Sequence, residues 1–167
     1  PADRVASSAI ADTGDTWLGK AVAPMLAAVP AGTSGFHAFA DPRDAFAARL
    51  VLAATAERAI DAQYYIWRDD RAGMLLFEAL WRAAERGVRV RLLLDDANTS
   101  GLDPILAVLD AHPRIEVRLY NPFVQRGARG WAFLTDFDRL NRRMHNKSFT
   151  ADDAATIVGG RNVADEY

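Results

Sequence analysis

Cysteine is absent from the chain, and histidine is scarce. The 167 residues contain no cysteine and three histidines, His37, His112 and His145. A chain without cysteine has no disulfide, no thiolate nucleophile and no cysteine-ligated metal. The three histidines are far apart and do not have the spacing of metal ligands. We therefore expect no metal site and no other cofactor.

The chain also lacks a large net charge and a long apolar run. Its formal net charge is −2, which argues against a surface built for nucleic acid. No run of about 18 apolar residues is available to span a bilayer. Half of the residues are hydrophobic, which suits one domain with a substantial core. Because the chain begins at Pro1 and ends at Tyr167, directly after a motif, we interpret it as part of a longer protein.

Helical and strand patterns alternate along most of the chain. This alternation predicts an α/β fold with a mixed, mainly parallel sheet and helices on both faces. We expect residues 1–34 to form a loose or helical N-terminal extension and residues 35–167 to form one domain. The expected helices span residues 16–28, 42–58, 73–86 and 102–111, and the expected strands span residues 36–39, 60–66, 88–94, 115–119, 145–151 and 154–158.

The stretch from Met144 to Asp152 contains the residues best suited to chemistry. In an extended strand, His145, Lys147 and Phe149 share one face. Histidine can act as a nucleophile or a general acid near neutral pH, and a lysine ammonium can hold a phosphate oxygen. Of the 20 basic residues only Lys20 and Lys147 are lysine, so the motif departs from the chain's strong preference for arginine.

A hairpin is expected directly after this strand. Asp152 and Asp153 form its turn, and residues 154–158 pair back on the motif strand. Gly159 and Gly160 then allow the backbone to approach closely, so that Asn162 turns towards His145 and Lys147.

Three further segments follow expected strands and are candidates for the walls of a pocket. In parallel sheets, function gathers beyond the carboxyl ends of the strands. This rule selects Gln63–Trp67, Asp95–Asn98 and Asn121. For the pair Asp95 and Asp96, helix capping and loop solvation is the better interpretation than catalysis.

A basic and aromatic stretch lies between Asn121 and Arg143. It contains five arginines and two aspartates, a local charge of +5 − 2 = +3, interleaved with Trp131, Phe133 and Phe137. This composition fits contact with anionic lipid head groups, and it also fits single-stranded nucleic acid. The alternative is a surface loop whose aromatic side chains pack on the domain.

The pattern His145-x-Lys147-x4-Asp152, followed by Gly159, Gly160 and Asn162, resembles the HKD motif of the phospholipase D superfamily. Four phrases resemble bacterial cardiolipin synthases, especially the class C type. They are residues 63–67 (QYYIW), 89–96 (RVRLLLDD), 140–147 (LNRRMHNK) and 159–162 (GGRN). The resemblance extends from about Phe36 to Tyr167 and suggests the N-terminal half of such an enzyme.

The resemblance implies phosphatidyl transfer in two steps without a metal. His145 would be the nucleophile or the general acid, Lys147 would hold the phosphate, and Asn162 would donate a further hydrogen bond to it. Asp152 belongs to the catalytic motif but is expected to order it rather than to contact substrate. Phosphatidylglycerol is the expected substrate, and a bacterial cell membrane, contacted peripherally, is the expected location.

The family's active site requires two motif copies, and this chain has one. The resemblance therefore implies a partner, either a second motif-bearing half or a second copy of the chain. Two alternatives remain open at this point. One is a phosphodiesterase or nuclease of the same superfamily that works as a dimer, and the other is a non-catalytic lipid-binding half-domain. Nucleic acid is not the expected partner, given the chain's net charge.

Overall fold

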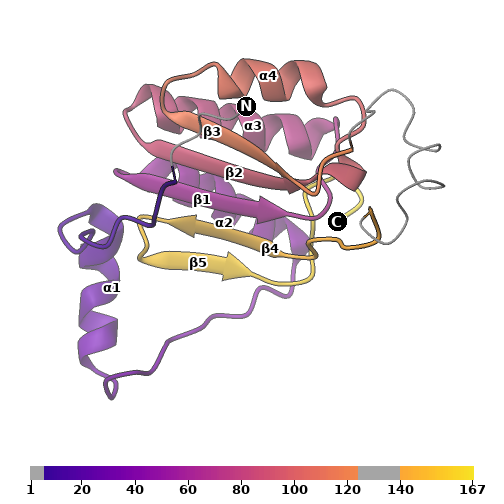
Figure 1. Cartoon of the computed structure of the whole chain (residues 1–167). Helices are drawn as coiled ribbons and strands as arrows, with labels where there is room; N and C mark the ends of the chain where they lie inside the picture. The colour runs from indigo at the N-terminus through magenta and orange to yellow at the C-terminus, as the bar shows by residue number, and fades with distance from the viewer. Residues whose placement is uncertain (1–5, 124–139) are drawn as a thin grey trace.

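The computed structural model describes residues 6–123 and 140–167 of the chain. Its centre is a five-stranded sheet in the order β3-β2-β1-β4-β5 (Figure 1). The strands are Ala59–Tyr64 (β1), Arg89–Asp95 (β2), Ile115–Tyr120 (β3), Lys147–Ala151 (β4) and Ala155–Val158 (β5).

Strands β1, β2 and β3 are parallel to one another, whereas β4 is antiparallel to β1 and β5 is antiparallel to β4. The predicted α/β class and mixed sheet are therefore confirmed. Among the described strands, two pairings are parallel and two are antiparallel. As predicted, the β4–β5 hairpin turns at Asp152 and Asp153, which have positive φ of 51° and 50°. A type I′ turn requires that backbone conformation at both central residues.

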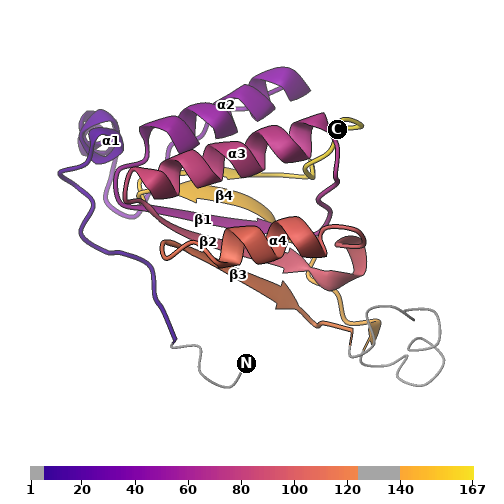
Figure 2. The same ribbon diagram turned by 90° about the horizontal axis from the view of Figure 1, so that it is seen from above.

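Three helices cover one face of the sheet, as Figure 2 shows from above. They are α2 (Pro42–Thr55), α3 (Arg71–Glu85) and α4 (Asp103–Asp110). On this face alternate strand residues such as Ile60, Val90 and Phe149 are fully buried, and they join Leu76 and Leu80 of α3 in one hydrophobic core. The period of two along each strand thus divides apolar from polar side chains.

The opposite face of the sheet is polar. Arg91 of β2 forms an ion pair with Asp61 of β1, and its Nη1 also donates to the carbonyl oxygen of Ser7 at 3.0 Å. We predicted helices on both faces, but α2, α3 and α4 all pack against the apolar face. In residues 6–123 and 140–167 the polar face instead contacts the N-terminal segment near Ser7.

Helix α1 (Trp17–Ala27) lies beside the sheet and extends away from it (Figure 1). The sequence offered Asp15 or Thr16 as the cap, and the structure shows that it is Thr16, which accepts a hydrogen bond from Gly19 N at 3.0 Å. Leu18 is buried in the main core. The prediction of a short strand at residues 36–39 is wrong, because this segment has no regular secondary structure and Phe36 is 96% exposed.

Helix α2 begins where the sequence predicts, because Asp41 accepts a hydrogen bond from Arg43 N at 2.8 Å and Pro42 follows it. It ends at Thr55, three residues before the predicted end. The backbone amides of Glu57, Arg58 and Ala59 donate to the side chain of Asp152 instead of continuing the helix.

Candidate active site

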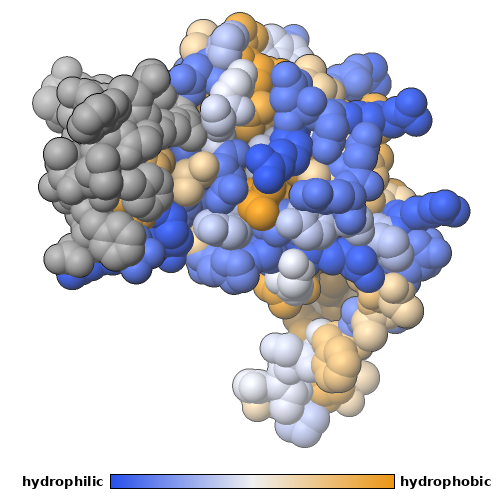
Figure 3. All heavy atoms as spheres, turned by 90° about the vertical axis from the view of Figure 1, so that its right-hand side faces the viewer, coloured by the Kyte–Doolittle hydropathy of each residue, from blue (hydrophilic) through white to orange (hydrophobic). Residues whose placement is uncertain are grey.

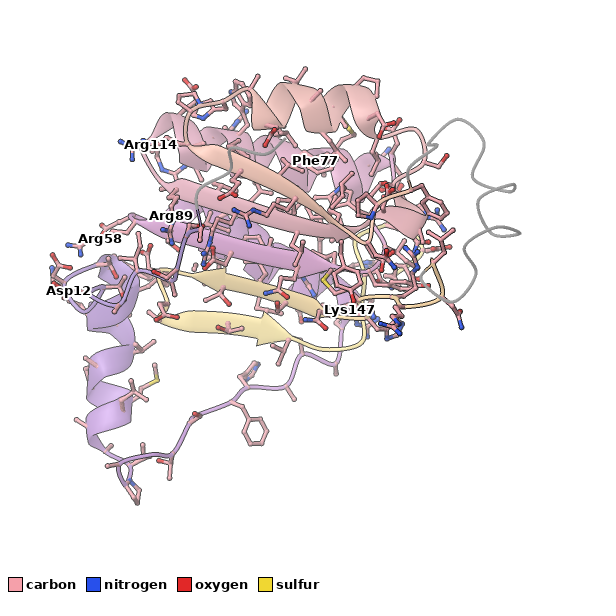
Figure 4. All side chains as sticks on the ribbon, viewed as in Figure 1. Asp12, Arg58, Phe77, Arg89, Arg114 and Lys147 are labelled. Carbon is pink, nitrogen blue, oxygen red and sulfur yellow. The ribbon has the colours of Figure 1, made fainter. Side chains whose placement is uncertain are left out.

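The candidate site lies at the carboxyl end of the parallel strands. Because β4 runs antiparallel to β1, its first residue, Lys147, pairs with the last residue of β1, Tyr64. Figure 4 shows Lys147 at this end of the sheet and Arg58 at the other end. The expected gathering of polar residues at the carboxyl edge is thus observed.

His145, Lys147 and Tyr65 form a small cluster at this edge. The ring centroids of His145 and Tyr65 lie 4.6 Å apart. The Lys147 ammonium lies 5.4 Å from the centroid of the Tyr65 ring and donates a hydrogen bond to the carbonyl oxygen of His145 at 2.9 Å. Tyr65 falls within the predicted wall segment Gln63–Trp67. The structure therefore brings the histidine and the lysine of the motif together.

His145 and Lys147 differ in environment. His145 precedes β4 and its side chain is exposed, whereas Lys147 is 8% exposed and lies on the helical face with Phe149. Burial lowers the pKa of the Lys147 amine. Within the described residues its one side-chain hydrogen bond goes to a neutral carbonyl, and it has no carboxylate partner. A cation held in this way favours an anionic ligand.

Asn162 lies against the backbone that follows β1, at Ile66, which is next to Tyr65 in the chain. Its Oδ1 accepts a hydrogen bond from Ile66 N at 3.1 Å, and Val163 forms an isolated bridge with Trp67. The side-chain Nδ2 has no partner among the described residues, so it remains a free donor. A Cβ at Gly159 or Gly160 would meet nothing within 4 Å. The close approach that we expected at these glycines is therefore not made within the described parts of the chain.

Asp95 fixes the segment that leads into the motif. Its carboxylate accepts hydrogen bonds from Met144 N at 2.7 Å and from Arg143 Nη1 at 3.0 Å. As predicted, it also acts as a cap, accepting from Ala97 N at 2.9 Å. The expected solvation is wrong, because Asp95 and Asp96 are both fully buried. Asp95 thus positions His145 through the two residues that precede it.

Two amide side chains complete the attachment of this segment. Asn146 Nδ2 donates to Gln63 Oε1 at 2.9 Å, and Asn121 Nδ2 donates to the carbonyl oxygen of Arg142 at 2.8 Å. Gln63 and Asn121 were both candidates for pocket walls, and the structure places them against the motif segment. The basic and aromatic prediction for residues 121–143 falls mostly on residues 124–139, which lie outside the described residues.

The structure does not bring Asp152 to this group. Asp152 follows the last residue of β4, at the opposite end of the strand from Lys147, and it is fully buried. Its carboxylate accepts hydrogen bonds from the backbone amides of Glu57, Arg58 and Ala59 at 2.8–3.0 Å. This geometry supports the expectation that Asp152 orders the motif rather than contacting substrate.

Sequence reasoning missed Arg49. The buried residues of helix α2 are Ala45, Arg49 and Ala53, and Arg49 is 5% exposed. Arg49 Nε donates to the hydroxyl oxygen of Tyr64 at 2.7 Å. Burial raises the pKa of Tyr64, and the nearby Arg49 charge opposes this shift only in part. The only sequence signal was the helical spacing of Arg49 from Ala45 and Ala53.

No cluster of three or more potential metal ligands occurs within residues 6–123 and 140–167. In the same residues no helix has the length and apolar character needed to cross a membrane. The assembled groups are an exposed imidazole, a buried ammonium and a free amide donor. Together they suit nucleophilic attack on a phosphodiester whose oxygens are held by cationic and amide groups.

Comparison with known proteins identifies the class to which this fold and site belong. Residues 51–166 match the family model described as "Cardiolipin synthase, PLD-like domain". The chain therefore belongs to this phospholipase D-like family.

Individual relatives narrow the similarity. The chain is 60% identical over 150 residues to cardiolipin synthase C of Escherichia coli, a match that covers 90% of this chain and 32% of that protein. It is 33% identical over 113 residues to a cardiolipin synthase of Staphylococcus aureus, covering 65% of this chain and 20% of the relative. The chain thus spans about a third of the length of the E. coli relative.

A solved structure supports the fold independently. NucT from Helicobacter pylori superposes with a TM-score of 0.54 at 18% sequence identity, covering 74% of this chain and 70% of the NucT chain. At this identity the similarity concerns the fold alone.

Proposed function

We propose that this chain is one motif-bearing half of a phosphatidyltransferase of the cardiolipin synthase type. The observation that carries the proposal is the juxtaposition of His145 and Lys147 on Tyr65. An exposed imidazole is free to attack, and the neighbouring buried ammonium has no carboxylate partner among the described residues. The E. coli relative is a cardiolipin synthase by name, which supports the same reaction class.

In the proposed first step an imidazole nitrogen of His145 attacks the phosphorus of a phospholipid. A nitrogen–phosphorus bond forms, and the phosphorus–oxygen bond to the head-group alcohol breaks. A histidine of a second motif copy gives its proton to the departing oxygen. The Lys147 ammonium and the Asn162 Nδ2 donate to the non-bridging oxygens, where negative charge develops.

In the second step the hydroxyl group of an acceptor phospholipid attacks the same phosphorus. Its proton passes to the second histidine, the nitrogen–phosphorus bond breaks, and the imidazole of His145 is restored. Dividing the displacement into two steps lowers each barrier, and neither step requires a metal. The second histidine comes from another half of the same protein or from a homodimer partner.

Phosphatidylglycerol is the proposed substrate, and the protein is proposed to work peripherally at the surface of a bacterial cell membrane. The test uses the native full-length protein that contains this chain, with vesicles of phosphatidylglycerol. His145→Ala is expected to reduce cardiolipin formation by about a thousandfold or more, since the nucleophile is lost. Mass spectrometry of the quenched protein is expected to find the phosphatidyl group on the peptide that contains His145.

The matched control is His37→Ala, which removes another exposed histidine, far along the chain from the motif. It is expected to leave turnover unchanged. Unchanged cardiolipin formation in His145→Ala would contradict the proposal. DNA cleavage by the purified protein without lipid turnover would instead indicate a phosphodiesterase of the same superfamily. Vesicle binding without any turnover would indicate a non-catalytic lipid-binding domain.

A further inference from the structure

A cavity of about 500 Å³ lies between the first turns of α2 and α3 and the segment that follows β5. Four arginines and one aspartate line it, giving these side chains a formal charge of 4 − 1 = +3. They are Arg43, Arg49, Arg71, Arg161 and Asp165. Figure 3 faces the carboxyl-end edge of the sheet, and most of the surface in this view is hydrophilic.

Arg49 is the buried cation of this cavity. Its Nε donates to Tyr64, and its Nη1 donates to the carbonyl oxygen of Ala45 at 2.6 Å. Its Nη2 has no hydrogen-bond partner among the described residues, and the side chain lines the cavity. Arg49 is 5% exposed, and an arginine this buried without a carboxylate partner is costly unless an anion compensates its charge.

The other three arginines likewise have no carboxylate partner in the part of the chain that the structure describes. In the described residues no acidic side chain lies within ion-pair distance of Arg43, Arg71 or Arg161. Arg161 donates to the backbone oxygens of Tyr167 and Ala40. The cavity therefore retains most of its positive charge.

Two acidic groups at the cavity, Asp165 and Asp70, are already engaged. Asp165 accepts a hydrogen bond from Ala72 N at 2.8 Å. The cap of α3, Asp70, accepts from Gly73 N and from Asp165 N. Arg43 and Arg71 lie in the first turns of their helices, where a positive charge opposes the helix dipole. The engaged carboxylates leave the arginine charges uncompensated, and the helix dipoles oppose two of those charges. Both effects are unfavourable for the empty protein and favourable for a bound anion.

The cavity adjoins the motif through two residues. Asn162, whose Nδ2 is free, lines the cavity. Tyr64 receives the hydrogen bond of Arg49 and pairs with Lys147 in the sheet. The wall also contains apolar side chains, Phe46 and Leu75 among them. A ligand with a phosphate group and an uncharged organic part fits this combination.

From this geometry we propose that the cavity binds the non-reacting phosphate of the phospholipid that accepts the phosphatidyl group. The inference rests on the proposed function and deepens it, because transfer between two phospholipids requires a place for the acceptor's own phosphodiester. Lys147 and His145 hold the transferred phosphate. The arginines hold the second phosphate, and the acceptor hydroxyl is thereby directed towards the phosphorus on His145.

The test compares acceptors in the full-length protein. Phosphatidylglycerol is an acceptor with a phosphate, and isotope-labelled glycerol, whose transfer is followed as labelled phosphatidylglycerol, is an acceptor without one. Arg71→Gln is expected to raise the KM for the phosphatidylglycerol acceptor roughly tenfold, the effect of losing one charge-assisted contact. Transfer to glycerol is expected to stay within about twofold of the parent protein. Arg82→Gln, a surface change on the same helix outside the cavity, is the matched control.

A binding measurement separates this inference from the proposed function. Full-length Lys147→Met protein is titrated with glycerol 3-phosphate and with inorganic phosphate, and Arg71→Gln is then added to that background. Weaker binding of glycerol 3-phosphate on adding Arg71→Gln supports the site even if no lipid turns over. If inorganic phosphate binds as tightly as glycerol 3-phosphate before Arg71→Gln is added, the cavity is a general anion site rather than an acceptor site, and the proposal is overturned. Unchanged binding, or equal loss of both transfer reactions, overturns it as well.

Discussion

The two ends of β4 carry the two charged residues of the motif, and they differ in how their charges are satisfied. Asp152, at one end, is fully buried and accepts hydrogen bonds from three backbone amides. Lys147, at the other end, is 8% exposed and donates to one neutral carbonyl. A buried charge with a complete set of partners stabilises the fold. A buried charge with an incomplete set remains able to bind a ligand.

The largest expected effect concerns Asp152, the buried charge with a complete set of partners. Asp152→Ala leaves three backbone amides without their acceptor, and we expect it to lower the free energy of unfolding by about 3–5 kcal/mol. Chemical denaturation measures this loss. Asp153→Ala is the matched control, because Asp153 has the same positive φ but is exposed. A similar loss in both variants would mean that turn conformation, not the amide contacts, explains the effect.

The second-largest expected effect concerns Lys147, the buried charge with an incomplete set of partners. Lys147→Met in the full-length protein is expected to lower kcat/KM by about a hundredfold or more, since the phosphate loses its cation. Unlike Asp152→Ala, it is expected to raise the melting temperature, because a poorly paired buried charge is replaced by an apolar side chain of similar length. Lys20→Met, at the other lysine of the chain, is the control and should change neither quantity. A fall in melting temperature with Lys147→Met would remove the contrast between the two ends.

A substitution of Asp95 tests whether the position of His145 depends on the hydrogen bonds that the buried Asp95 carboxylate accepts. Asp95→Asn keeps one acceptor oxygen but weakens the contacts to Arg143 and Met144. We expect kcat to fall about tenfold with little change in KM, because His145 is less well positioned while the cations are intact. Asp69→Asn, at an exposed position, is the control. An increase in KM with constant kcat would show that Asp95 affects binding rather than orientation.

The smallest effect is a shift in pH dependence. Burial lowers the pKa of Lys147, so its ammonium loses its proton at a lower pH than an exposed lysine does. Because the charged form holds phosphate, kcat/KM is expected to fall on the alkaline side as pH rises through this lowered pKa. Lys147→Arg is expected to move that fall to higher pH, since guanidinium remains protonated. An unchanged alkaline limb would show that another group controls it.

The same linkage predicts how stability depends on pH. The folded state binds the Lys147 proton less tightly than the unfolded state does. Stability is therefore expected to increase as pH rises from below the lowered pKa to the ordinary lysine value. This contribution is expected to be absent in Lys147→Met, which has no titrating group at that position.

Local features of the fold were predictable from the sequence because their causes are local. The caps at Thr16 and Asp41 and the turn at Asp152 and Asp153 depend on neighbouring residues alone. The partners of Asp95 and Asp152 were not predictable, because they lie 49 and up to 95 positions away in the chain. Arg49 was missed for a related reason. An arginine on a helix is normally exposed, and only the packed structure shows its contact with Tyr64.

The alternation of side chains between the two faces of β4 predicted the position of Lys147 and Phe149 but not that of His145. The sequence placed His145, Lys147 and Phe149 on one face, and the structure places Lys147 and Phe149 on the helical face. His145 precedes the strand, where strict alternation no longer applies. Whether a residue two positions before a strand remains extended depends on contacts such as those with Asp95, which no local pattern reveals.

The hydrogen bonds of Asp152 with the backbone amides also determine how far Lys147 lies along β4 from the fixed end of the strand. They fix β4 along its own axis relative to β1, and Lys147 stands 152 − 147 = 5 residues away, roughly 17 Å in an extended strand. Deleting one residue from β4 would withdraw the ammonium by about 3.4 Å and turn it to the polar face. Deleting two would restore the face but not the reach. The four-residue spacing in the motif therefore sets the distance between Asp152, which fixes the strand, and Lys147, which is proposed to bind the phosphate.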